Sequence, residues 1–154
     1  MEKNMRGTVR FLLAVFFLGL PGVTLAQELP DAERWFINDY APLWSGDMPA
    51  NLEKLKQIYA DEIVSHHADG AVTRDSQQSW LVEPMQGWLA EGWLGSTLIS
   101  VNVQPINATT VAFSAEWRDD YEGGGTERAC GWYLADAMNG GWMITEYADR
   151  PCSL

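Results

Sequence analysis

The two histidines of the chain, His66 and His67, are adjacent and follow a short apolar run. An imidazole titrates near neutral pH, so it can take up or release a proton under physiological conditions. Neighbouring side chains of a strand point to opposite faces, so one of the pair should face a site and the other solvent, and the two cannot chelate one metal ion. His67 is therefore a candidate general base, with a hydrogen-bonded structural histidine as the alternative.

Tyr40, Tyr133 and Glu146 are the candidates for holding or protonating a substrate beside such a base. Near the C-terminus, Asn139-Gly140 separates two apolar runs, which predicts a two-residue hairpin turn. Counting outward from that turn places Tyr133 opposite Glu146. If this face lines a pocket, Glu146 is a partly buried carboxylate of the kind found at functional sites. Otherwise it is a carboxylate at the rim of the sheet.

The aromatic side chains suggest a second kind of site. The chain has 8 tryptophans, many for its length. Most must lie in the core, where each buries a large area and needs a partner for its indole N–H. Some could line a cavity for a flat, hydrophobic ligand. The residues we expect in that role are Tyr59, Trp80, Trp88 and Trp117.

The order of the predicted elements indicates an α+β fold. Apolar residues recur at helical spacing over 31–44, after a capping Asp31, and again after a capping Asn51. A short strand over 62–67 turns back into 71–73, and a third helix runs from Asp75 or Ser76 to about Trp93, with Pro84 inside it. Four long antiparallel strands follow. Helices followed by strands predict helices packed on one face of a curved sheet.

The first 26 residues read as a signal peptide rather than as part of the fold. Three basic residues precede an apolar run over 11–20, and small residues at 24–26 offer a cleavage site. The run is short for a membrane span of about 20 residues, and an uncleaved anchor is the alternative. We predict a single domain over 27–154 that is exported to the periplasm or secreted, with no membrane attachment after cleavage.

The mature chain is strongly acidic, with seven basic and twenty acidic residues and a net charge of −13. Such a surface repels nucleic acid, and no cluster of Lys or Arg offsets it. We read the charge as a means of keeping an exported protein soluble, and expect no nucleic-acid partner.

Cys130 and Cys152 are the 2 cysteines of the chain. In an exported protein such a pair suggests one disulfide, here between the C-terminal tail and the first strand of the hairpin. No CxxC or HxxxH spacing indicates a metal site, and we expect no cofactor.

With these motifs in this order, the chain resembles the nuclear transport factor 2-like superfamily, in particular its SnoaL-like branch. The matching pieces are the Tyr-Ala-Asp-Glu-Ile-Val-Ser-His-His-Ala-Asp-Gly segment over 59–70, the Trp-rich third helix, Cys-Gly-Trp-Tyr over 130–133 and Gly-Gly-Trp-Met-Ile over 140–144. The resemblance implies a cone-shaped half-barrel of curved antiparallel sheet, with three helices packed on its concave side around a pocket. It also implies a homodimer.

A distant similarity to ketosteroid isomerases assigns individual roles. Counted from Tyr59, the isomerases' proton-shuttling aspartate corresponds to His67, and their tyrosine on the first helix falls near Tyr40. Their second, protonated aspartate falls around 131–133, where this chain has no acid. The dehydratase-like relatives carry a catalytic histidine where this chain has Thr97-Leu98-Ile99.

Three functions therefore remain open. The leading interpretation is a protein that binds a small hydrophobic molecule in an aromatic-lined pocket. The second is a cofactor-independent isomerase or dehydratase in which His67 is the base and Tyr40, Tyr133 or Glu146 assists. The third is a structural or partner-binding homodimer that uses the outer face of the sheet.

Overall fold

A computed structural model describes residues 31–138 and 140–152. The predicted signal peptide lies outside the described residues, as does Asn139 of the predicted turn. None of the described helices is long and apolar enough to cross a membrane.

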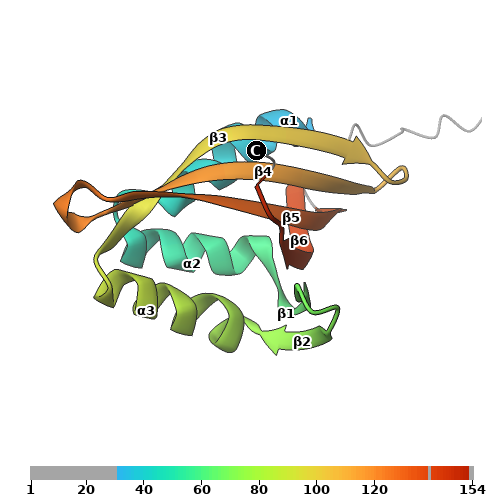
Figure 1. The fold of residues 1–154 in the computed structure, drawn as a ribbon. Coiled ribbons are helices and arrows are strands. Elements are labelled where there is room, and N and C mark those ends of the chain that lie inside the picture. Colours follow the sequence, from blue (N-terminus) through green and yellow to red (C-terminus); the bar gives the residue numbers. More distant parts are fainter. Residues whose placement is uncertain (1–30, 139, 153–154) are drawn as a thin grey trace, which may run out of the picture.

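One six-stranded sheet, in the order β2-β1-β6-β5-β4-β3, forms the body of the protein (Figure 1). Every neighbouring pair is antiparallel except β1 and β6, which run parallel. The sheet is not closed, and the fold is the predicted α+β cone. The strands are β1 (Tyr59–His66), β2 (Val72–Ser76), β3 (Trp93–Pro105), β4 (Thr110–Tyr121), β5 (Thr126–Met138) and β6 (Gly141–Asp149).

The first helical segment is less regular than its sequence predicts. It begins with α1 (Ala32–Trp35) and continues as a π-helical turn, η1 (Phe36–Tyr40), and a 3-10 turn, η2 (Ala41–Trp44). Asp31 caps it as predicted, because its side chain accepts a hydrogen bond from the Arg34 backbone N–H at 3.1 Å.

The cap predicted for the second helix, α2 (Met48–Ile58), is wrong. Asp47, not Asn51, is the N-cap, and its carboxylate accepts from the Ala50 backbone N–H at 3.3 Å. Pro49 therefore falls in the first turn of α2, where its missing N–H costs no hydrogen bond.

The predicted third helix is divided by its proline. A π-helical turn, η3 (Gln78–Val82), leads into α3 (Glu83–Ala90), and Pro84 lies in the first turn of α3. The helix ends three residues before the predicted Trp93, because Gly92 takes a positive φ of 88° and leads directly into β3.

The core lies between the inward face of the sheet and the helices. Strand β4 supplies it by alternation over 113–118, since Phe113, Ala115 and Trp117 are buried while Ser114 and Arg118 are exposed. The first helical segment packs on this row, and the rings of Phe36 and Phe113 lie 4.7 Å apart.

The pairing predicted between Tyr133 and Glu146 is wrong. Ala137 faces Trp142 and Ala135 faces Ile144 as expected, but the register shifts between Leu134 and Ala135, because β6 carries an extra residue, Thr145. Beyond this β-bulge Tyr133 faces Tyr147, and Glu146 faces Leu134. One inserted residue therefore exchanges the faces on which Glu146 and Tyr147 lie.

Cys130 and Cys152 form the predicted disulfide, with their Cα atoms 5.2 Å apart. Arg150 N–H donates to the carbonyl of Cys130 at 2.9 Å, so the tail continues alongside β5 after β6 ends. The bridge therefore fixes the C-terminal tail against the hairpin.

Replacing both cysteines by alanine should lower the free energy of unfolding by roughly 3 kcal/mol, because the bridge closes a loop of 22 residues in the unfolded chain. Urea unfolding of the oxidised protein and of the double variant measures this difference. Dithiothreitol should lower the stability of the wild type by the same amount and leave the variant unchanged. A difference below about 0.5 kcal/mol would contradict the expectation.

Candidate functional site

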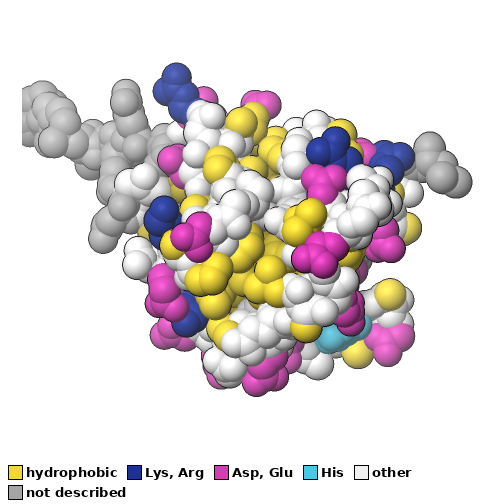
Figure 2. Space-filling model, turned by 90° about the vertical axis from the view of Figure 1, so that its left-hand side faces the viewer, with side chains coloured by type: hydrophobic (Ala, Val, Ile, Leu, Met, Phe, Trp, Pro, Cys, Tyr) yellow, Lys and Arg dark blue, Asp and Glu magenta, His cyan; other side chains and the backbone are white. Residues whose placement is uncertain are grey.

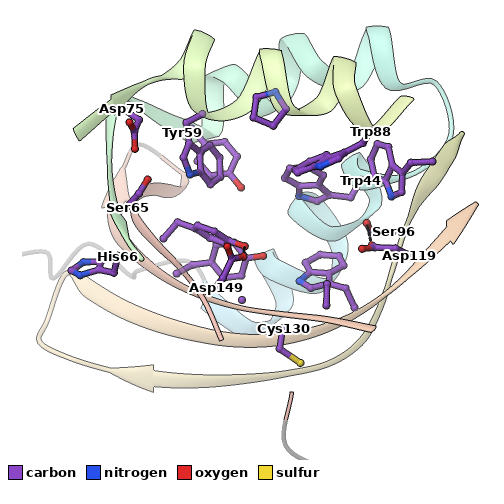
Figure 3. A pocket seen from close by; sticks show the side chains of 18 of the residues that line it. Trp44, Tyr59, Ser65, His66, Asp75, Trp88, Ser96, Asp119, Cys130 and Asp149 are labelled. Atoms are coloured by element: carbon purple, nitrogen blue, oxygen red, sulfur yellow. Dashed lines mark hydrogen bonds between the residues drawn. The ribbon is translucent and has the colours of Figure 1, made fainter. Parts of the chain in front are cut away.

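A cavity of about 490 Å³ lies between the sheet and the helical layer formed by η3 and α3 (Figure 3). Aromatic side chains make up most of its wall. All four residues predicted to line such a cavity do so, although their binding of a ligand stays a prediction. The lining aromatic residues are Trp44, Tyr59, Trp80, Trp88, Trp93, Trp117, Tyr121, Tyr133 and Tyr147.

One side of the cavity is a continuous set of ring contacts that joins β1, η3 and β6. The ring of Trp80 lies 4.8 Å from that of Tyr59 and 5.1 Å from that of Tyr147. Tyr147 in turn lies 5.3 Å from Tyr133 on β5. The bulge at Thr145 places Tyr147 in this wall, and no periodicity in the sequence signalled it.

Tryptophans form the other side. Trp44 ends η2, Trp117 comes from β4, and Trp88 and Trp93 flank the turn between α3 and β3, with their rings 5.8 Å apart. Trp88 is 41% exposed, as a residue that lines an open cavity can be. It belongs to the cavity wall because α3 covers the cavity rather than a filled core.

Tyrosine hydroxyls come together beneath the aromatic wall. Tyr40 is fully buried and its hydroxyl hydrogen-bonds that of Tyr59. Burial raises the pKa of Tyr40, of Tyr59 and of Tyr133 well above the ordinary value. The charge of an ionised Tyr133 would raise the pKa of Tyr40 and of Tyr59 further, whereas the hydrogen bond from Tyr40 lowers that of Tyr59. These phenols are therefore neutral hydrogen-bonding groups at physiological pH. Tyr59 and Tyr133 reach the cavity, whereas Tyr40 supports them from below.

The Nε1 atoms of two cavity tryptophans, Trp44 and Trp117, are buried. The indole N–H of Trp44 lies beside the Tyr40 hydroxyl and that of Trp117 beside the Tyr133 hydroxyl, and each lowers the pKa of its phenol against the larger effect of burial. Because neither Nε1 atom is exposed to the cavity, these donors serve the buried tyrosines and not a bound molecule.

The side chains of the adjacent histidines point in different directions and have different partners. His66 is among the residues that line the cavity, but its imidazole turns outward: Nε2 is 2.7 Å from the Glu146 carboxylate, and Figure 3 shows the ring pointing away from the cavity. His67 lies at the exposed rim, with Nε2 2.8 Å from the Thr73 hydroxyl. The structure therefore does not bring together the predicted catalytic set. Tyr40 is under the wall, Tyr133 is in it, His67 is at the rim and Glu146 is on the other side of the sheet.

Polar residues that the sequence analysis did not select lie at this rim. Thr73 donates to the Asp75 carboxylate at 2.7 Å, which connects His67 to Asp75. The hydrogen bond from Thr73, followed by the influence of the Ser65 hydroxyl, lowers the pKa of Asp75. Alternation along β1 and β2 places these side chains on the inward face with Ser65, a signal that the sequence carried once the β1–β2 register was known.

Two further carboxylates line the cavity. Asp119 on β4 accepts a hydrogen bond from the Ser96 hydroxyl at 2.5 Å, and Asp149 at the end of β6 accepts one from the Tyr147 hydroxyl. Within 31–138 and 140–152, no group of three or more His, Cys, Asp or Glu side chains is placed to hold a metal ion. The three cavity aspartates are thus separate groups held by neighbouring hydroxyls.

The buried tyrosines predict an alkaline limit to stability. The folded protein favours the neutral form of these tyrosines, whose pKa is raised by burial, whereas unfolded tyrosines ionise near pH 10. Their contribution to the free energy of unfolding is therefore complete below about pH 10 and is lost as the pH rises further. We expect the free energy of unfolding to fall above pH 10 by about 1.4 kcal/mol per pH unit for each buried tyrosine. Urea unfolding between pH 8 and 11, with phenolate absorbance, measures it.

Tyr40→Phe is the matched control for this prediction. Above pH 10, the free energy of unfolding of this variant should fall less steeply with pH, by the contribution of one tyrosine, because Phe cannot ionise. Phenolate absorbance from the folded protein that rises for all tyrosines near pH 10 would contradict the expectation.

Comparison with known proteins identifies solved structures of the same fold. No protein-family model matches the chain, and no curated protein matches it in sequence. The structure is similar to a cystatin-like fold protein from Caulobacter vibrioides, with 17% identity, a TM-score of 0.56 and 80% of this chain and 89% of that one covered.

Two more solved structures agree. A proposed scytalone dehydratase from Novosphingobium aromaticivorans has 13% identity and a TM-score of 0.55, with 79% and 83% of the two chains covered. An NTF2-like protein of unknown function in nutrient uptake from Rhodospirillum rubrum has 17% identity and a TM-score of 0.51, with 73% and 91% covered. The resemblance found in the sequence is confirmed at the level of the fold: the chain has the cone-like α+β fold of the nuclear transport factor 2-like superfamily.

Proposed function

We propose that this protein is an exported binding protein that holds a small, largely apolar molecule in the aromatic cavity. The observation that carries the proposal is the cavity itself, about 490 Å³ in volume and walled by tyrosine and tryptophan rings. Sites for small molecules in proteins have volumes of about 300–1,000 Å³ and apolar walls with a few placed polar groups. The size and the lining fit a flat ligand of one or two rings.

The polar groups of the wall support a specific orientation of that ligand. The neutral hydroxyls of Tyr59 and Tyr133 can donate or accept. A ligand with one polar oxygen among apolar atoms would hydrogen-bond such a hydroxyl and leave its remaining surface against the rings.

The disulfide supports the proposed export, because disulfides persist in oxidising compartments. The third interpretation, a partner-binding homodimer, has less support. The outer face of the sheet carries ion pairs, with Arg118 3.0 Å from Asp120 and Arg128 paired with Glu116. An interface of this kind would have to cover charged groups, which are depleted from interface cores.

A flat neutral probe tests the binding proposal. 2-Naphthol should bind one to one and change the tryptophan fluorescence. Trp80→Leu should weaken that binding by about tenfold, because it removes the ring that bridges Tyr59 and Tyr147. Trp132→Leu is the control, since Trp132 lies on the outer face beside His66 and should leave the affinity unchanged. No binding by the wild type, or equal losses in both variants, would contradict the proposal.

One observation favours an enzyme as the second candidate. The chain of hydrogen bonds from His67 through Thr73 ends at Asp75, a carboxylate that lines the cavity. Such a relay could move a proton between solvent and a bound substrate. The reaction class would be cofactor-independent isomerisation or dehydration.

His67→Ala separates the two functions. For a binding protein, the variant should hold 2-naphthol within about twofold of the wild-type affinity, because His67 contacts Thr73 rather than the aromatic wall. For an enzyme, the same variant should lose turnover in a screen of ketones and hydroxyketones, and Thr73→Val should lose it too. Turnover by the wild type that survives both changes would exclude the relay.

A further inference from the structure

The charges around the cavity are of one sign. Asp75, Asp119 and Asp149 line it, and within the described parts of the chain no Lys or Arg does. Figure 3 shows Asp75 at one end of the cavity, Asp119 at the other and Asp149 between them. Separated in this way, the three carboxylates do not form a site for one metal ion, and an organic molecule that spans the cavity could meet any of them.

The end at Asp119 combines a fixed carboxylate with tryptophan rings. Asp119 follows Trp117 by two positions on β4, so both side chains lie on the inward face, and Ser96 holds the carboxylate by a hydrogen bond of 2.5 Å. In Figure 3, Trp44 and Trp88 lie at the same end of the cavity as Asp119 and Ser96. The rings carry electron density on their faces, which attracts a cation, and tryptophan does so most strongly.

The surroundings strengthen the negative potential at this end. Burial raises the pKa of Tyr121 in the cavity wall, and the carboxylates of Glu127, Asp119 and Glu91 raise it further. Among the residues that the structure describes, none of these three carboxylates forms an ion pair with Lys or Arg. The nearby Arg118 and Arg128 are paired on the outer face.

This end of the cavity lies toward an apolar hollow on the surface. The turn from α3 to β3 and the turn between β4 and β5 lie on the left of Figure 1. On the face seen from that side, hydrophobic side chains gather at the centre, and acidic side chains together with Lys and Arg lie around them (Figure 2). The chain has 21 acidic and 10 basic residues, so an apolar cation that enters here is attracted by the protein as a whole and meets rings on contact.

We propose that the ligand is an organic cation, and that its ammonium group sits between the Asp119 carboxylate and the rings of Trp44, Trp88 and Trp93. This inference rests on the proposed function and names the class of ligand. The apolar part of the molecule extends toward Tyr59 and Tyr133. There the hydroxyls of Tyr59 and Tyr133 can hydrogen-bond an oxygen of the same ligand. A tertiary or quaternary amine joined to a ring system has this chemistry, and an anionic ligand is disfavoured.

Matched probes test the charge directly. Phenyltrimethylammonium and tert-butylbenzene have the same shape and differ in charge, and benzoate is an anion of similar size. We expect the cation to bind at least tenfold more tightly than its neutral isostere in fluorescence titrations at low ionic strength. Benzoate should not bind measurably.

Paired variants locate the cation. Asp119→Asn keeps an acceptor for Ser96 and removes the charge, so it should weaken phenyltrimethylammonium binding by about five- to tenfold and leave tert-butylbenzene within twofold. Asp120→Asn is the control, because the next residue on β4 faces outward and pairs with Arg118. Trp88→Leu should reduce the preference for the cation, and Trp88→Phe should restore part of it.

The outcomes are distinguishable. Equal binding of the cation and the neutral isostere would overturn this inference and leave the proposed binding function intact. A preference for the cation that Asp119→Asn changes no more than Asp120→Asn does would overturn the assigned position. If neither probe nor 2-naphthol binds, the proposed function itself fails. Thermal unfolding of each variant shows whether a lost affinity reflects a lost fold.

Discussion

The structure depends on the packing of one helical segment against the inward row of β4 and β5. Phe36 lies 4.7 Å from Phe113 and 5.7 Å from Tyr133, and the Tyr40 hydroxyl bonds that of Tyr59 at the junction of α2 and β1. In the sheet, β1 is separated from β4 by β6 and β5. The helical segment contacts both β1 and β4, so it connects strands that are not neighbours in the sheet. An unfilled cavity lowers the stability of a protein. The burial of these aromatic rings stabilises the fold and offsets that cost.

The cavity exists because the helical layer packs on only part of the inward face. The first helical segment packs directly on Phe113 and Trp117. The η3 and α3 segments cover another part of the inward face, and there the tryptophan and tyrosine rings surround the cavity. Large, rigid rings meet at angles and do not fill such a space completely. The same residues that build the core thus provide the wall of the site.

The site is distinguished from a filled core by its polar groups. Neutral phenols and three separated aspartates open onto one apolar space. A fold with many functions does not choose among them, so the organic cation that we propose is inferred from this chemistry and not from the fold. From the sequence, we read the acidity of the chain as a means of keeping it soluble. With Asp119 in the cavity wall, we propose that part of this charge also attracts the ligand.

The sequence alone determined the α+β order of elements and the Asp31 cap, because both follow from local spacing. It also determined the cysteine pair, because the chain has 2 cysteines. It also selected Tyr59, Trp80, Trp88 and Trp117 for the cavity. It could not place Glu146 or Tyr147, because the bulge at Thr145 inverts their faces and leaves no periodic signal. Which aspartates meet the tryptophans was likewise decided by tertiary structure, because side chains far apart in the sequence converge only through strand register and helix packing.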